Sequence, residues 1–276
     1  MKKTFLLFVA LLSLTLHAQK KQKIKGNREV LIKKFTLPSF SALEVGEKFE
    51  IGLEKSSDTT RVVIETDDNL FDVIHFSVED GVLRFSTSME IVKKKRLKIT
   101  LFVPEHFDQI RLIEKGKVYN EEELTFENMR IEAIQKGKAD LRLRIRKTLA
   151  IEATDKAALE MEATTSEATI HLAESAELKA KMNAKTVEVV LDDHAYAKLE
   201  GDAKQMKLDA KSKSEFKGNN FAVTEAVINV SDKATARIKI TGHVVLQLSG
   251  DSETYLYGSP KINLKKFKDN AILYKK

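Results

Sequence analysis

Cysteine and tryptophan are absent from this 276-residue chain, and proline and glycine are scarce, with three and eleven residues. The lack of cysteine excludes a disulfide scaffold, and the low glycine and proline content excludes a collagen-like chain. Hydrophobic residues make up 42% of the sequence, too many for a disordered chain and enough to form the core of one large domain or two smaller ones. The 47 basic and 41 acidic side chains leave a net charge of only +6, which does not indicate nucleic-acid binding.

The first 18 residues have the pattern of a secretory signal peptide. Lys2 and Lys3 precede the largely apolar run Phe5–Leu16, and Leu16-His17-Ala18 resembles a cleavage site. A helix of that run would span only about 18 Å of a hydrocarbon core about 30 Å thick, so a membrane anchor is not favoured. We predict cleavage after Ala18 and export to the periplasm, the cell surface or the extracellular space, with no transmembrane span.

The chain after the signal peptide divides into three parts. Residues 19–34 begin with a basic, apolar-poor stretch and are predicted to form a flexible leader. Residues 35–113 contain short alternating segments such as Lys48–Leu53 and Leu97–Leu101, separated by turn sequences such as Glu79-Asp80-Gly81, and this pattern predicts a β-rich N-terminal part. Residues 114–276 form a third part that repeats itself.

The repeat has a period near 19 residues. Its turn triplets are spaced by 21, 19, 19, 19, 19, 20 and 18 residues and lie at Lys115-Gly116-Lys117, Lys136-Gly137-Lys138, Asp155-Lys156-Ala157, Glu174-Ser175-Ala176, Asp193-His194-Ala195, Ser212-Lys213-Ser214, Asp232-Lys233-Ala234 and Gly250-Asp251-Ser252. An alternating strand follows each triplet, and a second turn recurs near the middle of the repeat. Such a unit cannot bury its apolar face alone, so successive units must stack into a parallel β-solenoid. A leucine-rich repeat has an overlapping period, but its regular Leu and Asn positions are missing.

The register of the repeat predicts which side chains enter the core. The predicted inward residues are Leu159, Leu178, Val189 and Ile238, and the predicted outward residues are Glu160, Lys179, Lys198 and Lys239. At the C-terminal end, Lys261–Lys276 is too apolar for a free tail. We expect it to fold back as a cap over the terminal coil, with Tyr255 and Tyr257 packed beneath it. The competing interpretation is a tail that docks onto a secretion or envelope partner.

Segments at both ends of the mature chain carry a family resemblance. The opening pattern is Phe40–Val45 leading to Phe49-Glu50-Ile51, then Val62–Glu65 with Asp67–Leu70, then Val78–Leu83, and the closing pattern is Tyr257–Ile262. These segments resemble the putative auto-transporter adhesin family with the head GIN domain. The resemblance implies a right-handed parallel β-helix in exported bacterial proteins, with a role in adhesion and without an established catalytic set.

Asp192-Asp193-His194 is the most enzyme-like cluster in the sequence. Carbohydrate enzymes built on a β-helix use paired carboxylates to protonate a leaving group and to activate water. The same repeat position holds ordinary turn residues elsewhere, so a solvated turn is the favoured interpretation. Tyr255, Tyr257 and Tyr274 lie near the C-terminal end, where end packing is favoured over a platform for sugar rings.

Stacking of the repeats would also align charged residues. Neighbouring coils lie about 4.8 Å apart, and an acidic corner column would contain Asp155, Glu174, Asp193 and Asp232. Its repulsion calls for neutralisation, and the adjoining Lys156, Lys213 and Lys233 are favoured over Ca²⁺.

Two basic groups are candidates for anion binding. Lys93–Arg96 could contact anionic lipid or polysaccharide, although a solvated loop between strands is favoured. Arg142, Arg144 and Arg146 alternate with apolar residues, which indicates a soluble strand surface first and an anion-binding stripe second.

We therefore predict an all-β exported protein, a right-handed parallel β-helix preceded by a β-rich part, that acts as a non-catalytic binding or structural module in adhesion at the cell envelope. The alternative is a carbohydrate-active enzyme, a polysaccharide lyase or hydrolase, on the same scaffold. The expected partner is an envelope or extracellular glycan or protein, and nucleic acid is not expected. No catalytic, cofactor-binding or metal-binding residues and no cofactor are predicted, since His75, His106, His171 and His243 have no metal-ligand spacing.

Overall fold

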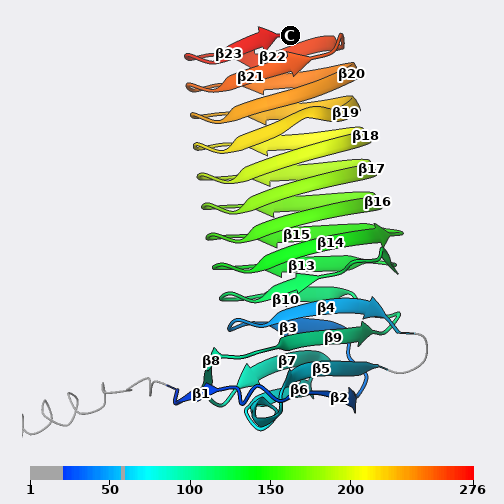
Figure 1. Cartoon of the computed structure of the whole chain (residues 1–276). Coiled ribbons are helices and arrows are strands. Elements are labelled where there is room, and N and C mark those ends of the chain that lie inside the picture. The colour runs from blue at the N-terminus through cyan, green and yellow to red at the C-terminus, as the bar shows by residue number, and fades with distance from the viewer. Residues whose placement is uncertain (1–20, 57–59) are drawn as a thin grey trace, which may run out of the picture.

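Strands account for almost all regular structure in the computed structural model, which describes residues 21–56 and 60–276 (Figure 1). The first strands are β1 (Lys23–Lys25), β2 (Val30–Thr36), β3 (Ala42–Val45), β4 (Glu50–Lys55), β5 (Arg61–Asp67), β6 (Ile74–Glu79), β7 (Val82–Thr87), β8 (Glu90–Lys93) and β9 (Leu97–Val103), with a 3-10 turn η2 (Asp68–Leu70). The later strands are β10 (Gln109–Leu112), β11 (Lys117–Tyr119), β12 (Leu124–Phe126), β13 (Met129–Ala133), β14 (Lys138–Ile145), β15 (Thr148–Ala153), β16 (Ala158–Leu172), β17 (Glu177–Leu191), β18 (Tyr196–Ala210), β19 (Glu215–Val230), β20 (Thr235–Leu248), β21 (Glu253–Tyr257), β22 (Lys261–Phe267) and β23 (Ile272–Lys275). The predicted signal peptide lies outside the described residues.

The later strands stack as parallel coils (Figure 1). Each of the long strands β16 to β20 crosses one face of the coil, bends, and continues on the other face. The pairing of β16 with β17 is in register on both faces, with Leu159 opposite Leu178 and Ile170 opposite Val189. The predicted β-solenoid is confirmed, with about nine turns of about 19 residues each.

Alternation along the coils fills the interior of the stack. Leu159, Leu178, Val189 and Ile238 are each at most 2% exposed, as the register of the repeat predicts. The predicted outward residues Glu160, Lys179 and Lys239 are exposed, and Lys198 is half-buried. One inward column contains Leu159, Leu178, Ala197, Phe216 and Ala236, so small side chains above and below make room for Phe216.

A tight turn at one edge of each coil sets the length of the repeat. Its first central residue has φ between 52° and 73° and is Glu47, Glu114, Gln135, Asp155, Glu174, Asp193, Ser212, Asp232, Gly250 or Asp269. We call these ten residues the corner column. In the first two predicted triplets the turn begins one residue earlier than expected, at Glu114 and Gln135. Asp and Asn adopt this left-handed conformation more readily than most residues, which explains the acidic turn positions.

The third turn residue is small because it faces the coil below. A Cβ atom at Gly116 would lie 2.1 Å from the backbone oxygen of Val45, so only glycine fits there. Later coils have room for the buried Ala157, Ala176 and Ala195 at the same position.

The stack begins earlier than residue 114, where the sequence placed the start of the repeats. Ala42 of β3 pairs with Gln109 of β10, and Glu50 of β4 pairs with Lys117 of β11. Strands β5 to β9 come between these two coils in the sequence but not in space. They lie at the N-terminal end of the stack (Figure 1). There β7 and β9 extend the two parallel sheets, whereas β5 and β6 pair antiparallel with β9 and β7.

The described part of the predicted flexible leader, residues 21–34, contributes to two paired strands. β1 pairs in parallel with β8, and β2 pairs antiparallel with β5 from Val30 opposite Asp67 to Thr36 opposite Arg61. The expectation of a flexible leader is therefore wrong for these residues. Ile24 packs against the core while its lysine neighbours face water, so the many lysines conceal the strand in the sequence.

The expected fold-back of Lys261–Lys276 is also wrong. β22 pairs in parallel with β20 and β23 with β21, so the segment adds one more coil. Ile262 and Leu264 continue the inward positions of Val244 and Leu246, and they remain 42% and 44% exposed at the open end. The ring of Tyr255 does pack beneath the segment, stacked on Tyr274 with centroids 4.6 Å apart.

The open end carries features that oppose the addition of another strand. The register shifts between Leu246 and Gln247, which places a bulge in β22. Lys275 continues the column of buried Leu256, and its Nζ donates to the backbone oxygens of Gly258 and Lys276. A bulge and an inward charge are common protections of an exposed sheet edge. Within the described ranges, no helix has the length and apolar character needed to cross a bilayer.

The buried register can be tested with one adjacent pair of substitutions. Ile238→Asp should lower the free energy of unfolding by several kcal/mol, because it buries an unpaired carboxylate where the wild-type side chain is 0% exposed. Lys239→Asp, one residue along on the outer face, should change it little. Thermal unfolding followed by circular dichroism measures both, and equal melting temperatures for the two variants would contradict the assignment.

Candidate binding cleft at the solenoid corner

Side chains of the corner column hydrogen-bond to the backbone of the coil below. The N–H of Glu47 donates to Glu114 Oε2 at 2.7 Å, that of Glu114 to Gln135 Oε1 at 2.7 Å, and that of Gln135 to Asp155 Oδ2 at 2.9 Å. The same contact recurs where Asp232 accepts from Ser212 N. An acidic or amide side chain thus satisfies an N–H group that the turn would otherwise leave unpaired.

The sequence predicts that adjoining lysines neutralise the acidic corner residues, and the structure shows a different arrangement. Among the described residues, Lys156, Lys213 and Lys233 form no ion pair within 4 Å, and backbone N–H groups hold Asp155 and Asp232 instead. Within the same residues no three His, Asp or Glu side chains are grouped to hold a metal ion.

The next turn position forms a row of lysines. Lys48, Lys115, Lys136 and Lys156 each follow a corner-column residue on successive coils, where neighbouring coils are about 4.8 Å apart. We call these four residues the lysine row. Lys48 Nζ lies 3.8 Å from Glu90 Oε1, while Lys115 and Lys136 have no ion pair among the described residues. The ammonium groups of the row therefore repel one another without full compensation.

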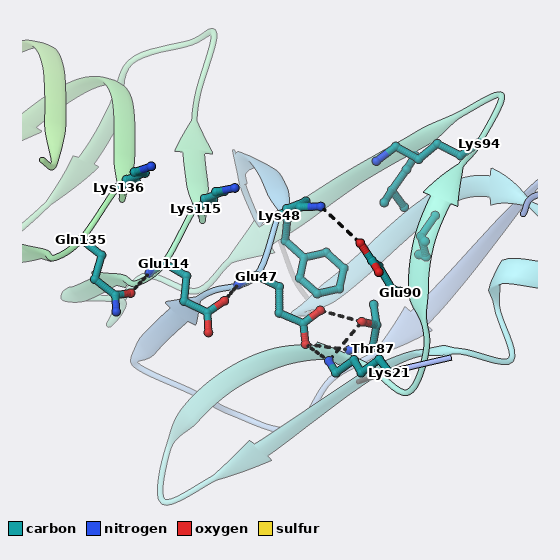
Figure 2. Close-up of a pocket in the computed structure, with 13 residues that line it drawn as sticks. Lys21, Glu47, Lys48, Thr87, Glu90, Lys94, Glu114, Lys115, Gln135 and Lys136 are labelled. Carbon is teal, nitrogen blue, oxygen red and sulfur yellow. Dashed lines mark hydrogen bonds and ion pairs between the residues drawn. The ribbon is translucent and has the colours of Figure 1, made fainter. Parts of the chain in front are cut away.

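A cleft of about 660 Å³ lies where the lysine row meets the inserted strands (Figure 2). One wall contains Lys48, Lys115 and Lys136, and the opposite wall comes from the β7–β9 region with Glu90 and Lys94. The apolar side chains of Phe49, Ile91 and Leu97 line the cleft between these walls. The lining includes five lysines and three glutamates, so the cleft is positively charged.

Glu47 is the most constrained carboxylate of the cleft. Its Oε1 lies 2.6 Å from Lys21 Nζ and accepts from Thr87 N, and its Oε2 accepts from Thr87 Oγ1 at 2.6 Å (Figure 2). Burial raises the pKa of Glu47, but the hydrogen bonds from Lys21 and Thr87 lower this pKa more, and the net shift is downward. Glu47 is therefore an ionised structural group, ill suited to act as a proton acceptor.

Asp67 positions the loop that carries Lys94. Its buried carboxylate accepts hydrogen bonds from Arg28 N at 2.6 Å, Lys95 N at 2.8 Å and Arg96 N at 3.2 Å. Burial raises the pKa of Asp67, but the backbone N–H groups outweigh it and lower the pKa overall. Lys93 of the run Lys93–Arg96 ends β8, and Lys94–Arg96 form a loop that Asp67 holds from inside. Lys94 lines the cleft.

The cleft is not predicted from the sequence. One sequence signal points to it, because Lys115 and Lys136 recur at equivalent turn positions and indicate a row of lysines. The opposite wall had no signal, since the pairing of β4 with β9 connects residues about 50 positions apart in the chain. Nothing in the sequence around Asp67 indicates that its carboxylate accepts hydrogen bonds from three backbone N–H groups.

The Asp192-Asp193-His194 cluster lies on a different coil from the cleft. Asp192 accepts from Ser212 Oγ at 2.6 Å and from Asp193 N at 2.8 Å, and these two bonds lower its pKa. Asp193 and His194 are exposed at the corner, and Asp193 has the left-handed φ of the column. The arrangement makes Asp192 a structural acceptor for the turn.

The arginine stripe is paired with the coil below it. Arg144 Nε lies 2.8 Å from Glu123 Oε1, Arg146 Nη1 lies 2.8 Å from Glu127 Oε1, and Arg142 donates to a backbone oxygen. The outer faces of later coils carry similar exposed pairs, such as Lys181 with Glu162 and Lys207 with Glu188. These ion pairs connect charges of adjacent coils on the faces, whereas Lys115 and Lys136 of the lysine row have no ion pair among the described residues.

One family model matches most of the chain. It is described as "Putative auto-transporter adhesin, head GIN domain", and it matches residues 39–181 and, overlapping these, residues 142–260. No curated protein matches the chain.

Several solved structures are similar along nearly the whole chain. A putative adhesin from Parabacteroides merdae ATCC 43184 has a TM-score of 0.68 and 15% identity, covering 92% of this chain and 99% of its own. A putative lipid binding protein from Parabacteroides distasonis ATCC 8503 has a TM-score of 0.60 and 15% identity, covering 92% and 99%. A putative adhesin from Bacteroides fragilis NCTC 9343 has a TM-score of 0.59 and 20% identity, covering 87% and 100%. At these identities the likeness establishes the fold alone.

The side-chain ladder of the corner column predicts a difference between two equivalent acids. Asp155→Ala should cost about 1 kcal/mol more in unfolding free energy than Glu174→Ala, because only Asp155 accepts a bond from the turn below. Both residues have nearly the same φ, 58° and 59°, so the backbone cost of alanine cancels in the comparison. Chemical denaturation measures both values, and equal losses would show that the ladder contributes nothing.

Asp67 predicts an acid-dependent loss of stability. The pKa of Asp67 is lower in the folded state than in the unfolded chain, so its ionised carboxylate stabilises the fold. This stabilisation is complete above the Asp67 pKa of the unfolded chain and is lost as pH falls through the Asp67 pKa of the folded state. Asp67→Asn should therefore lower the melting temperature at neutral pH and approach the wild type in strong acid. Asp68→Asn, which changes an exposed neighbour paired with Lys33 at 3.5 Å, is the control. A difference in melting temperature between wild type and Asp67→Asn that stays the same at every pH would refute this role.

Proposed function

This chain belongs to the putative auto-transporter adhesin family with the head GIN domain, and we propose that it is an exported, non-catalytic binding module in adhesion at the cell envelope. One observation carries the proposal. The cleft presents Lys94, Lys115 and Lys136 without ion pairs among the described residues, whereas its carboxylates Glu47 and Glu114 are engaged by protein donors. Free cations on a rigid stack are suited to holding a ligand.

Polysaccharide hydrolysis or elimination on this scaffold is the second candidate, and the geometry favours it less. Hydrolysis requires two carboxyl groups that flank the scissile bond, one to protonate the leaving group and one to act on water or sugar. Glu47 and Glu114 instead accept hydrogen bonds from Lys21, Thr87 and Glu47 N. In the other candidate cluster, Asp192-Asp193-His194, Asp192 accepts a hydrogen bond from Ser212 Oγ. These contacts support a binding role over acid–base chemistry.

The proposed location and partner follow from the family and from the N-terminal sequence. Removal of residues 1–18 would release a mature chain to the periplasm or the cell surface, where a glycan or protein of the envelope or the extracellular space is the proposed partner. A structural neighbour described as a putative lipid binding protein adds lipids to the ligands that merit testing.

Glycan and extracellular-matrix arrays with the mature chain, run beside a polysaccharide-cleavage screen, test this function. We expect retention of a ligand with no new reducing ends and no unsaturated products. Asp192→Asn and Asp193→Asn should leave that binding unchanged, because both residues serve the turn. Cleavage that disappears in either variant while its melting temperature is kept would establish the enzyme instead.

A further inference from the structure

We propose that the cleft binds a small anionic amphiphile, in which a phosphate or carboxylate head group is joined to an aliphatic body. The proposal rests on the proposed function in treating the cleft as the ligand site, and it goes further by naming the chemical class. It combines two features of this cleft, a basic wall with three lysines that have no ion pair among the described residues and an aliphatic floor.

The basic wall would hold the head group. Lys94, Lys115 and Lys136 are exposed, and none of them has an ion pair among the residues that the structure describes. They converge from two walls, with Lys115 and Lys136 on adjacent corners and Lys94 on the loop anchored by Asp67 (Figure 2). Ammonium groups donate strong charge-assisted hydrogen bonds to phosphate and carboxylate oxygens. An anion bound between them would also relieve their mutual repulsion.

The acidic residues of the cleft do not oppose an anion there. Glu47 is paired with Lys21 at 2.6 Å, and Glu90 lies 3.8 Å from Lys48. Glu114 accepts a hydrogen bond from Glu47 N and belongs to the corner ladder. Two of the three carboxylates therefore have a cation of their own, and the three remaining lysines face one glutamate.

The floor favours an aliphatic body over a sugar polymer. The ring of Phe49 is only 2% exposed, so the half-buried Ile91 and Leu97 supply most of the apolar contact surface. Binding of sugar rings usually uses exposed aromatic faces, and this floor offers aliphatic groups instead. The volume of about 660 Å³ is within the range of small-molecule sites.

Calorimetric titration of the mature chain with dodecyl phosphate, kept below its micelle concentration, tests the proposal. Three further ligands separate the contributions: inorganic phosphate has only the head group, dodecyl maltoside has only the tail, and a sulfated polysaccharide is a polyanion without a tail. We expect saturable binding of dodecyl phosphate at one site and much weaker binding of the other three. Equal or tighter binding of the polysaccharide would overturn the proposal in favour of an acidic glycan.

Matched charge reversals locate the site. Lys115→Glu with Lys136→Glu should weaken dodecyl phosphate binding by about tenfold or more. Lys213→Glu with Lys233→Glu changes the same turn position on distant coils, outside the cleft, and should have no effect. Unchanged binding by the first pair, with a wild-type melting temperature, would overturn the assignment.

A second pair of variants tests the floor. Ile91→Ser removes an apolar lining residue and should weaken binding by about tenfold, through lost burial of the aliphatic body. Val227→Ser, at a 40% exposed residue on a distant coil, is the control. If Ile91→Ser binds like wild type, the ligand is not an amphiphile. A ligand found on the arrays that is insensitive to all these variants would leave the proposed function standing and this inference refuted.

Discussion

Parallel stacking of one coil on another in constant register is the constraint on which this structure depends. Because Leu159 pairs with Leu178 and Glu177 with Tyr196, each side chain has the equivalent residues of adjacent coils as its nearest neighbours. Every position therefore becomes a column with one environment. Inward columns must share a fixed width, which explains why Phe216 lies between Ala197 and Ala236. In outward columns, charged side chains lie next to charged side chains of adjacent coils, so like charges must be separated or paired with opposite ones.

Charged side chains have different partners on the faces and at the corner. On the faces, arginines and lysines pair with glutamates of the adjacent coil, as Arg144 does with Glu123. At the corner, the acids use their oxygens to satisfy backbone N–H groups of the turn below, as Asp155 does for Gln135 N. Lys115 and Lys136, which follow Glu114 and Gln135, consequently have no ion pair among the described residues. The chemistry of the cleft is thus a by-product of how the turn satisfies its own backbone.

The two ends of the stack are closed in different ways. At the N-terminal end the antiparallel strands β2, β5 and β6 cover the first coil, and the buried Asp67 links them to the loop beside the cleft. At the C-terminal end the last coil is open, with apolar Ile262 and Phe267 exposed and the charge of Lys275 pointing inward. The cleft lies at the first end, where the inserted strands lie beside the corner column (Figure 1).

The family resemblance, the solenoid and its inward register were determined by the sequence itself, and the structure and comparisons confirm them. They depend on local alternation and on a period of about 19 residues, which any stacked coil must repeat. The pairing of residues 21–34, the extra coil at the C-terminal end and the cleft were decided only by the tertiary structure. Each depends on contacts between segments that are distant in the sequence, such as Arg28 N with Asp67 or Ile262 with Val244. The local sequence of a strand does not specify which distant strand has an unpaired edge for it to join.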